Sequence, residues 1–255
     1  MTLLDSIILG IVEGITEFLP ISSTGHMILV SHLLGIKQGT FEKTFEIAIQ
    51  LGAILAVVAI YKEKLKGNLE LWKKLIAAFI PTGIIGLALH RWVEELFNPL
   101  VVSTALIVWG VIFIVVELLY REEEHYIERP EELPYKKAIL IGVFQSLAMV
   151  PGTSRSGATI VGGLLLGMKR VAATEFSFLL AIPTMFAATL FEITKNYQAI
   201  TASNAPILAT GFITAFISAF FAVKWLLNYV KSHTFIPFGI YRIVVGIVFL
   251  TILAR

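Results

Sequence analysis

Long stretches of apolar residues dominate this chain, and they decide what it can fold into. Of its 255 residues, 57% are hydrophobic and only 15% are charged, against about 25% charged residues in a typical soluble domain. Several stretches approach the roughly 20 residues that an α-helix needs to cross a bilayer. The apolar residues are continuous and do not alternate with polar ones, as they would in a membrane β-barrel. The sequence therefore predicts an all-α polytopic membrane protein.

Six apolar stretches are long enough to form full spans, and two others are broken. The predicted spans cover residues 44–61, 74–90, 99–120, 171–194, 206–227 and 235–253. Residues 3–35 are interrupted by Pro20 and the polar stretch SSTGH (22–26), and residues 138–168 are interrupted by PGTSRSGAT (151–159). Irregular polar backbone is stable at membrane depth only where protein or a water-filled cavity surrounds it. We therefore interpret both broken segments as re-entrant helix hairpins, with two ordinary kinked helices as the alternative.

The two broken segments resemble each other, which indicates a tandem duplication. When Gly10 is aligned with Gly142, the alignment pairs Glu13 with Gln145, Ser22 with Ser154, Ser23 with Arg155, Thr24 with Ser156, and Gly25 with Gly157. The chain is therefore predicted to be a single membrane domain over residues 1–255. Repeat 1 covers about 1–120, a cytoplasmic linker about 121–137, and repeat 2 about 138–255.

Each predicted repeat consists of one re-entrant helix hairpin plus three transmembrane helices. Because three spans are an odd number, the second repeat must be inverted in the bilayer relative to the first. Lys and Arg residues are more numerous in the loops on the side of the linker, which the positive-inside rule assigns to the cytoplasm. This inverted-topology repeat opens the first hairpin to the outside and the second to the cytoplasm. The tips of the hairpins then meet near the middle of the membrane, as in other inverted-repeat proteins.

Two acidic residues precede the first polar loop at a spacing that places them on one helical face. Glu13 and Glu17 lie one helical turn apart, so their carboxylates are neighbours. A charge at membrane depth costs roughly 2.5–3.5 kcal/mol on insertion scales, and such residues usually face a cavity. Two close carboxylates suit a divalent cation, or a metal ligand beside a general base. The alternative is that both face the outer interface near the end of the helix.

Arg155 lies in the second polar loop and needs an anion at that depth. A guanidinium keeps its proton in proteins, so Glu13 or Glu17 pairs with it, or a ligand does. Arginine matches phosphate oxygens with two parallel hydrogen bonds, and hydroxyls and helix N-terminal amides add further donors. We predict an anion site around Arg155 that is built from Ser22, Thr24, Gly25, Ser154, Ser156 and Thr159. Small residues also serve helix packing in membranes, which is the alternative.

His26 directly follows the first polar loop. It could exchange a proton near neutral pH or help to activate Ser23 as a nucleophile, while a hydrogen-bonded core histidine is the alternative. We expect Arg242, the other arginine at membrane depth, to build the cavity or to pair with an acid. Polar residues within other spans are possible partners, namely Glu46, Gln50, Gln145, Glu175 and Glu192.

Several other classes of site are excluded by what the sequence lacks. There is no cysteine, so no thiolate chemistry or Cys-bound metal is available. There is no P-loop motif and no HExxH motif, which excludes the usual nucleotide motor and zinc protease. A net charge of +2 gives no sign of a nucleic-acid partner. The predicted site is one that holds a phosphorylated group where lipid meets water.

In these residues the chain resembles the bacterial undecaprenyl-diphosphate phosphatases linked to bacitracin resistance. The family has a Glu/Gln-x-x-x-Glu motif and a Pro-Gly-x-Ser-Arg-Ser-x-x-Thr motif. Both are present, as Glu13 to Glu17 and as Pro151 to Thr159, with the histidine of the family at His26. The resemblance covers essentially the whole chain and is strongest over residues 10–35, 43–58, 142–167 and 175–183.

The resemblance implies a hydrolase that removes the terminal phosphate of undecaprenyl diphosphate. This recycles the carrier lipid for peptidoglycan and other wall polymers and confers resistance to bacitracin. It also implies a divalent cation, Mg²⁺ or Ca²⁺, for which Glu13 and Glu17 are the expected ligands. The protein would lie in the bacterial inner membrane with its active site on the extracytoplasmic side. Its expected partners are the polyprenyl lipid and the membrane, and a homodimer is compatible with the sequence.

Four residues are expected to be catalytic. Arg155 would bind the diphosphate, Ser23 would attack the terminal phosphorus, and Glu17 or His26 would take the proton. Attack by water or by His26 itself stays open. A transporter or flippase of a phosphorylated polyprenyl lipid is the alternative function, because inverted repeats with broken helices are also features of transporters. A membrane protein that confers immunity without chemistry fits poorly with acidic and basic residues at such depth.

Overall fold

The computed structural model describes residues 1–37 and 39–253, and this part of the chain is helical with no β-strand. Its first half contains α1 (Leu3–Thr16), α2 (Ser23–Leu33), α3 (Thr40–Leu65), α4 (Leu69–Glu95) and α5 (Pro99–Leu119). A linker with the short 3-10 helix η1 (Pro130–Glu132) follows. The second half contains α6 (Tyr135–Ser146), η2 (Leu147–Met149), α7 (Arg155–Leu165), α8 (Arg170–Asn196), η3 (Tyr197–Ala199), α9 (Ala205–Tyr229) and α10 (Ile236–Leu253). The all-α class predicted from the sequence is confirmed.

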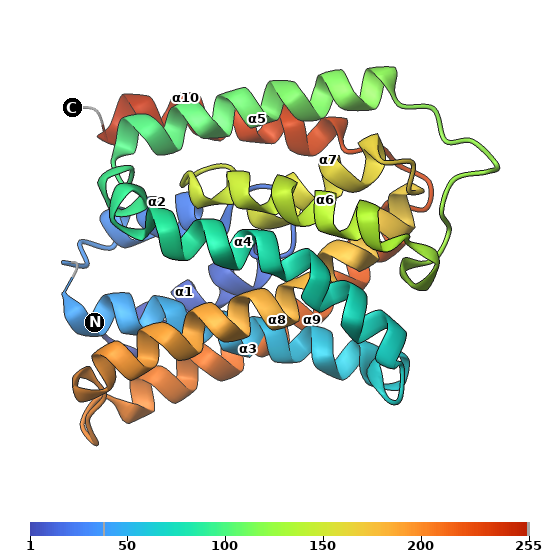
Figure 1. Ribbon diagram of the computed structural model, residues 1–255. Coiled ribbons are helices and arrows are strands. Elements are labelled where there is room, and N and C mark those ends of the chain that lie inside the picture. Colours follow the sequence, from blue (N-terminus) through green and yellow to red (C-terminus); the bar gives the residue numbers. More distant parts are fainter. Residues whose placement is uncertain (38, 254–255) are drawn as a thin grey trace.

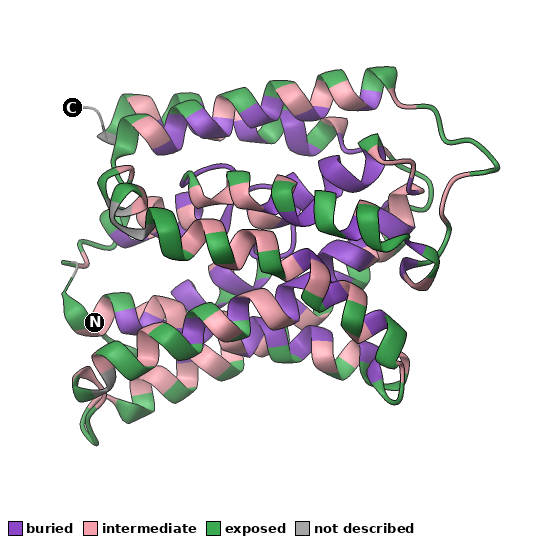
Figure 2. Cartoon of the chain, viewed as in Figure 1, coloured by how far each residue is buried: buried purple, intermediate pink, exposed green. Residues whose placement is uncertain are grey.

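Five helices in the described residues are long and apolar enough to cross a membrane. They are α3, residues Leu69–Leu89 of α4, α5, α8 and α9. The sequence predicted a sixth span over 235–253, and there the structure has α10, which counts only as a shorter apolar helix. Large apolar side chains on the outer faces of these helices are exposed, including Leu87, Leu119 and Phe221. Figure 2 shows this distribution, with the buried residues gathered inside the bundle. The chain is a multi-pass membrane protein.

The two broken segments fold as pairs of short helices. α1 and α2 have 14 and 11 residues, and α6 and α7 have 12 and 11, so none reaches the roughly 20 residues of a span. Local signals explain where they begin and end. Ser22 and Ser154 are the N-caps of α2 and α7, and Gly35 and Gly167 follow the two helices with φ of 66° and 78°, as helix-ending glycines do.

Helices from the two halves of the chain are interleaved. α1 packs against α9, α5 against α10, and α4 against α6, and Figure 1 shows α5 and α10 side by side at the top of the view. Glycines allow several of these contacts, because small residues let helix backbones approach closely. A Cβ on Gly14 would lie 2.4 Å from the carbonyl oxygen of Ala215, and one on Gly142 would overlap the carbonyl oxygen of Ala78. Each cluster of buried apolar residues contains side chains from both halves.

Candidate active site

Two loops, residues 17–22 between α1 and α2 and residues 150–154 before α7, meet inside the bundle. They overlap the polar stretches predicted from the sequence only in part, because Ser23 and Arg155 already begin α2 and α7. Ser156 Oγ donates a hydrogen bond of 3.0 Å to the carbonyl oxygen of Leu19. Arg242 of α10, which is fully buried, joins the loops a second time. It donates from Nη1 to the carbonyl oxygen of Pro20 at 2.9 Å and from Nη2 to those of Gly152 and Thr153 at 2.7 and 2.8 Å.

Each loop ends in a serine with a left-handed backbone. Ser22 has φ of 71° and Ser154 has φ of 76°, and they are the only non-glycine residues with positive φ in the described chain. Their hydroxyls accept hydrogen bonds from the amides of Gly25 at 3.4 Å and Gly157 at 3.1 Å. Such conformations cost free energy and cluster at functional sites. The aligned positions of the two broken segments thus share one unusual conformation.

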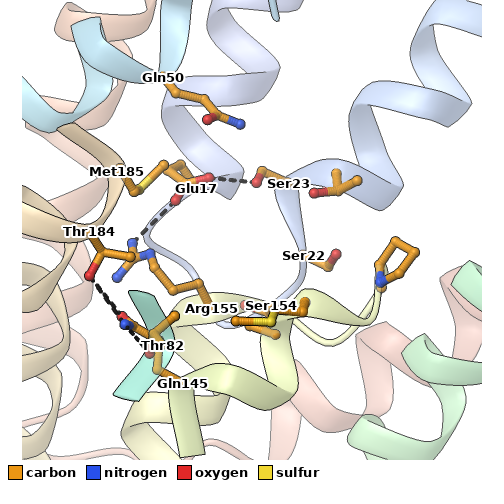
Figure 3. A pocket seen from close by; sticks show the side chains of 15 residues that line it. Glu17, Ser22, Ser23, Gln50, Thr82, Gln145, Ser154, Arg155, Thr184 and Met185 are labelled. Atoms are coloured by element: carbon orange, nitrogen blue, oxygen red, sulfur yellow. Dashed lines mark hydrogen bonds and ion pairs between the residues drawn. The ribbon is translucent and has the colours of Figure 1, made fainter. Parts of the chain in front are cut away.

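A cavity of about 210 Å³ lies where the loops meet. It is lined by Glu17, Ser22, Ser23, Thr24, Gln50, Thr82, Gln145, Ala148, Met149, Pro151, Gly152, Ser154, Arg155, Thr184 and Met185. Figure 3 shows Ser22 and Ser23 on one side, Ser154 and Arg155 on another, and Glu17 between Ser23 and Arg155. α2 and α7 begin at Ser23 and Arg155, so the positive ends of two helix dipoles lie beside the cavity.

Glu17 links the candidate nucleophile to the candidate anion-binding residue. Its Oε2 accepts a hydrogen bond of 2.6 Å from Ser23 Oγ, and its Oε1 accepts one of 3.2 Å from Arg155 Nη2. Arg155 also donates from Nη1 to the carbonyl oxygen of Ser177 at 2.9 Å, while its buried Nε has no partner in the described structure. A carboxylate that accepts from a serine hydroxyl is placed to act as a general base.

Six of the residues predicted from the sequence therefore share one cavity: Glu17, Ser22, Ser23, Thr24, Ser154 and Arg155. Glu13 lies outside it, one turn earlier on α1 and buried, and its Oε1 has no hydrogen-bond partner in the described structure.

Three further predicted anion-site residues also lie outside the cavity lining and contribute to packing or hydrogen bonding. Gly25 faces Leu106 and Val102 of α5. Thr159 donates to Ser177 Oγ at 2.6 Å, and Ser156 is bonded to Ser154 Oγ at 3.0 Å as well as to Leu19. The hydroxyls of Ser156 and Thr159 also bond to residues that line the cavity, namely Ser154 and the carbonyl oxygen of Arg155.

His26 is buried beside the cavity, and both of its ring nitrogens are hydrogen-bonded. Nδ1 lies 2.8 Å from the carbonyl oxygen of Ser22 and Nε2 lies 2.8 Å from Tyr241 Oη. The two rings are also stacked, with centroids 5.6 Å apart. In this arrangement His26 supports the loop that carries Ser22 and Ser23, and it presents no free nitrogen to the cavity.

Two threonines that were not predicted from the sequence, Thr82 and Thr184, complete the cavity wall. Gln145 Nε2 donates to Thr82 Oγ1 at 2.9 Å and to Thr184 Oγ1 at 3.1 Å. Both threonines follow an isoleucine–proline pair, Ile80-Pro81 and Ile182-Pro183, inside a long apolar helix. That repeated Ile-Pro-Thr sequence is the signal that would have pointed to them. Gln50 and Gln145, which also line the cavity, were among the polar residues predicted as possible partners of the charged residues.

The acidic residues can hold a divalent cation only with help from another ligand. The described residues contain no group of three or more His, Cys, Asp or Glu side chains placed to bind a metal. Glu13 still has a free oxygen, whereas both oxygens of Glu17 already accept hydrogen bonds. Mg²⁺ is often bound by one or two carboxylates together with phosphate oxygens of a substrate. The donor set therefore fits a cation that arrives with a diphosphate.

Comparisons with known proteins agree over nearly the whole chain. The family described as bacitracin resistance protein BacA matches residues 6–248. A protein of Persephonella marina is 59% identical over 250 residues, which cover 98% of each chain. The relative from Aquifex aeolicus is 54% identical over 98% of each chain, and that from Methanococcus aeolicus is 49% identical over the full length of both. All three relatives are named undecaprenyl-diphosphatase.

Proposed function

The chain belongs to the BacA family of bacitracin resistance proteins, and from this premise we propose that it hydrolyses undecaprenyl diphosphate to undecaprenyl phosphate and inorganic phosphate. The observation that carries the proposal is the arrangement of Ser23, Glu17 and Arg155 around one cavity. Glu17 accepts hydrogen bonds from both Ser23 and Arg155, and this supports their proposed roles as base, nucleophile and anion-binding cation. The product is the carrier lipid for cell wall polymers, and its recycling explains resistance to bacitracin.

Arg155 holds the diphosphate in the proposed reaction. In the structure its guanidinium is paired with Glu17, and the more highly charged diphosphate competes for it. The hydroxyls of Ser22, Thr24 and Ser154 line the same cavity and donate to phosphate oxygens. Amides at the start of α2 and α7 add to this positive field. Phosphoryl transfer depends mainly on such positioning and charge stabilisation.

Ser23 is the nucleophile of the proposed mechanism. Its oxygen forms a bond with the terminal phosphorus while the bond from that phosphorus to the bridging oxygen breaks, and its proton passes to Glu17. Undecaprenyl phosphate leaves and takes up the proton from Glu17. Water then attacks the phosphorus of the phosphoserine and gives a proton to Glu17, while the bond from phosphorus to Ser23 Oγ breaks; Ser23 recovers this proton and inorganic phosphate leaves. His26 would have to give up hydrogen bonds to Ser22 and Tyr241 before its ring could attack, so we assign it the support of the Ser22–Ser23 loop.

Glu13 and Glu17 would be the protein ligands of a divalent cation, Mg²⁺ or Ca²⁺. Glu13 and Glu17 would hold it together with oxygens of the diphosphate, as the free oxygen of Glu13 suggests. When bound, the cation supplies charge neutralisation to the diphosphate. Glu17 would then act both as a ligand of the cation and as the base for the Ser23 proton, whereas Glu13 would act only as a ligand.

The topology belongs to the same proposal. The two halves of the chain each contain two short helices followed by three longer ones, which supports an inverted-topology repeat with two re-entrant hairpins. We place the protein in the bacterial inner membrane, with the linker at 121–137 in the cytoplasm and the active site on the extracytoplasmic side. There the site meets the diphosphate lipid where it is released during wall synthesis.

Phosphate release by the purified protein in detergent tests the proposed function. Wild type should release phosphate from undecaprenyl diphosphate, a chelator should reduce the rate, and Arg155→Ala should abolish it. A transporter or flippase without hydrolytic activity would release none in detergent, where no transport is possible. A phosphorylated Ser23 trapped in a rapid quench would identify the nucleophile. Single-turnover phosphate carrying one oxygen from labelled water, without any phosphoserine, would instead favour direct attack by water.

A further inference from the structure

One polar wall of the active-site cavity has no role in the proposed hydrolysis as described so far. It is formed by Thr82 of α4, Gln145 of α6 and Thr184 of α8. Gln145 is buried, and its amide nitrogen Nε2 donates to Thr82 Oγ1 at 2.9 Å and to Thr184 Oγ1 at 3.1 Å. Figure 3 shows these three side chains together on one side of the Arg155 guanidinium, with Glu17 and Ser23 on its other side.

Both threonine hydroxyls donate their protons to backbone carbonyl oxygens. Thr82 Oγ1 donates to Gly142 at 2.9 Å, and Thr184 Oγ1 donates to Leu180 at 2.8 Å. Because a hydroxyl has one proton to donate, each threonine oxygen can only accept from Gln145. Thr184 Oγ1 also lies 3.4 Å from Gln145 Oε1, but the contact with the Leu180 carbonyl is much shorter and takes the proton. The two threonines therefore fix the orientation of the Gln145 amide.

The fixed amide has an acceptor, and no donor, left for a molecule in the cavity. Both hydrogens of Nε2 are used by the threonines, which leaves the carbonyl oxygen Oε1 of Gln145 to bind a ligand. The phosphate oxygens of the substrate are acceptors as well, so Oε1 cannot bind them as the donors of Ser22, Ser154 and Arg155 can. A water molecule has two hydrogens to donate and therefore suits this oxygen.

The second step of the proposed reaction needs a water molecule on this side of the phosphate. In phosphoryl transfer the attacking and leaving oxygens lie roughly in line, so the water must approach the phosphorus from the side opposite Ser23 Oγ. Arg155 holds the phosphate in the proposed mechanism, and Gln145 lies across Arg155 from Ser23 in Figure 3. Gln145 is also the residue that aligns with Glu13 between the two broken segments. The amide keeps an acceptor oxygen at this position without adding a negative charge beside the diphosphate.

We propose that Gln145 Oε1 orients the water that hydrolyses the phosphoserine at Ser23. Thr82 and Thr184 are positioning residues, which act by fixing the amide. The inference rests on the proposed function, because it concerns the second step of the same reaction. The water oxygen forms a bond with phosphorus while the bond from phosphorus to Ser23 Oγ breaks. One water hydrogen passes to Glu17 and from there to Ser23 Oγ. The other stays on the attacking oxygen and is hydrogen-bonded to Gln145, which takes no proton.

Rapid-quench kinetics with undecaprenyl diphosphate in detergent separate the two steps. Gln145→Met replaces the amide with an apolar side chain of similar length. We expect the first turnover to keep its rate, with one undecaprenyl phosphate released per protein molecule and the phosphoserine at Ser23 accumulating. Later turnovers should be about 100-fold slower than in wild type, the cost of a misplaced reacting group. A merely structural role of Gln145 would slow the first turnover too, and the thermal unfolding midpoint of the same sample checks the fold.

The threonines provide matched variants. Thr184→Val removes the oxygen that accepts from the amide and should slow hydrolysis of the phosphoserine about tenfold, which corresponds to the loss of one hydrogen bond. Thr184→Ser keeps the hydroxyl and should restore the wild-type rate. Thr189→Val is the control, because Thr189 is also buried in α8 but its Oγ1 has no partner in the described structure. The control should behave as wild type, and a burst with phosphoserine in Thr189→Val would contradict the role of Thr184.

Other outcomes for Gln145→Met would overturn the inference and leave the hydrolysis intact. Wild-type kinetics would remove Gln145 from the reaction, and slow turnover without phosphoserine would show that it does not act in a separate water step. A raised KM with unchanged kcat would make it a substrate-binding residue. A raised Mg²⁺ concentration for half-maximal activity, with unchanged kcat at saturating Mg²⁺, would make it a ligand of the cation. Failure of wild type to release phosphate would instead overturn the proposed function itself.

Discussion

Arg155 shows how much of the site depends on the shape of a single side chain. Its guanidinium donates from Nη2 to Glu17 and from Nη1 to the carbonyl oxygen of Ser177. Its Cζ also lies 5.7 Å from the centroid of the Phe18 ring. A lysine keeps the positive charge but has no planar fork, so it cannot make both contacts and still meet a phosphate.

Arg155→Lys should therefore lower kcat by about 100-fold, the usual cost of losing one donor that stabilises transition-state charge. The measurement is phosphate release in detergent at saturating undecaprenyl diphosphate. The thermal unfolding midpoint of the same preparation serves as the control for folding. Near wild-type turnover in a folded sample would remove Arg155 from the proposed anion site.

The left-handed serines make a prediction about stability. Ser154→Gly and Ser154→Ala both lose the hydroxyl that caps α7, so the difference between them reports only the backbone at φ of 76°. Alanine is strained there and glycine is not, and we expect Ser154→Ala to be less stable than Ser154→Gly by about 1 kcal/mol. Thermal unfolding in detergent measures this difference, and an alanine variant that equals or exceeds the glycine variant would contradict the strain.

At the scale of elements, small residues decide how the helices from the two halves pack. Gly142 of α6 lies against the backbone of α4 at Ala78, where an added Cβ has no room. Gly83 of α4 is in a helix too, but the nearest atoms to a Cβ there belong to the ring of Phe79, at 3.3 Å. Both glycines lie within helices, but Gly142 faces the backbone of another helix and Gly83 faces a side chain of its own helix.

Gly142→Ala should therefore be destabilised, because α6 must move away from α4. Gly83→Ala should be neutral or more stable by up to about 1 kcal/mol, the helix propensity that alanine gains over glycine. Activity should fall in the first variant, since α6 carries Gln145 and leads to the loop of Ser154. Equal unfolding midpoints for the two variants would show that α4 and α6 are not closely packed.

At the scale of the whole molecule, Arg242 ties α10 to loops from both halves of the chain. Three carbonyl oxygens, of Pro20, Gly152 and Thr153, accept hydrogen bonds from this fully buried cation. Removing the side chain leaves those acceptors without partners in the interior, which costs roughly 1–3 kcal/mol for each unsatisfied group. The position of the two loops relative to each other therefore depends on the side chain of Arg242.

Arg242→Met should lower the thermal unfolding midpoint and also reduce kcat, because Ser23 and Arg155 directly follow the two loops that Arg242 joins. Arg242→Lys, which keeps the charge but not the fork, should recover stability more than activity. A methionine variant with wild-type kcat would show that the loops keep their register without Arg242. Measuring the unfolding midpoint and kcat on the same sample distinguishes a loss of folding from a misplacement of Ser23 relative to Arg155.

Several features followed from the sequence because their causes are local. A run of apolar residues long enough to span the bilayer forms a helix wherever it lies, so the spans of α3, α5, α8 and α9 were predictable. The segments 3–35 and 138–168 are broken as predicted, but the breaks lie at 17–22 and 147–154, and most residues of the predicted polar stretches form the first turns of α2 and α7. Glu17, Ser23 and Arg155 were recognisable as a site because charges and hydroxyls at such depth need a polar cavity.

The tertiary structure alone decided which polar side chains face that cavity. His26 and Thr159 are residue types that are common in active sites, yet their polar atoms form hydrogen bonds with Tyr241 and Ser177 on helices distant in the sequence. Thr82 and Thr184 lie in apolar helices far apart in the chain, and they meet only through Gln145. The contacts of Arg242 have the same origin. Helix rotation and the interleaving of the two halves set these contacts, and both depend on packing between residues that are remote in sequence.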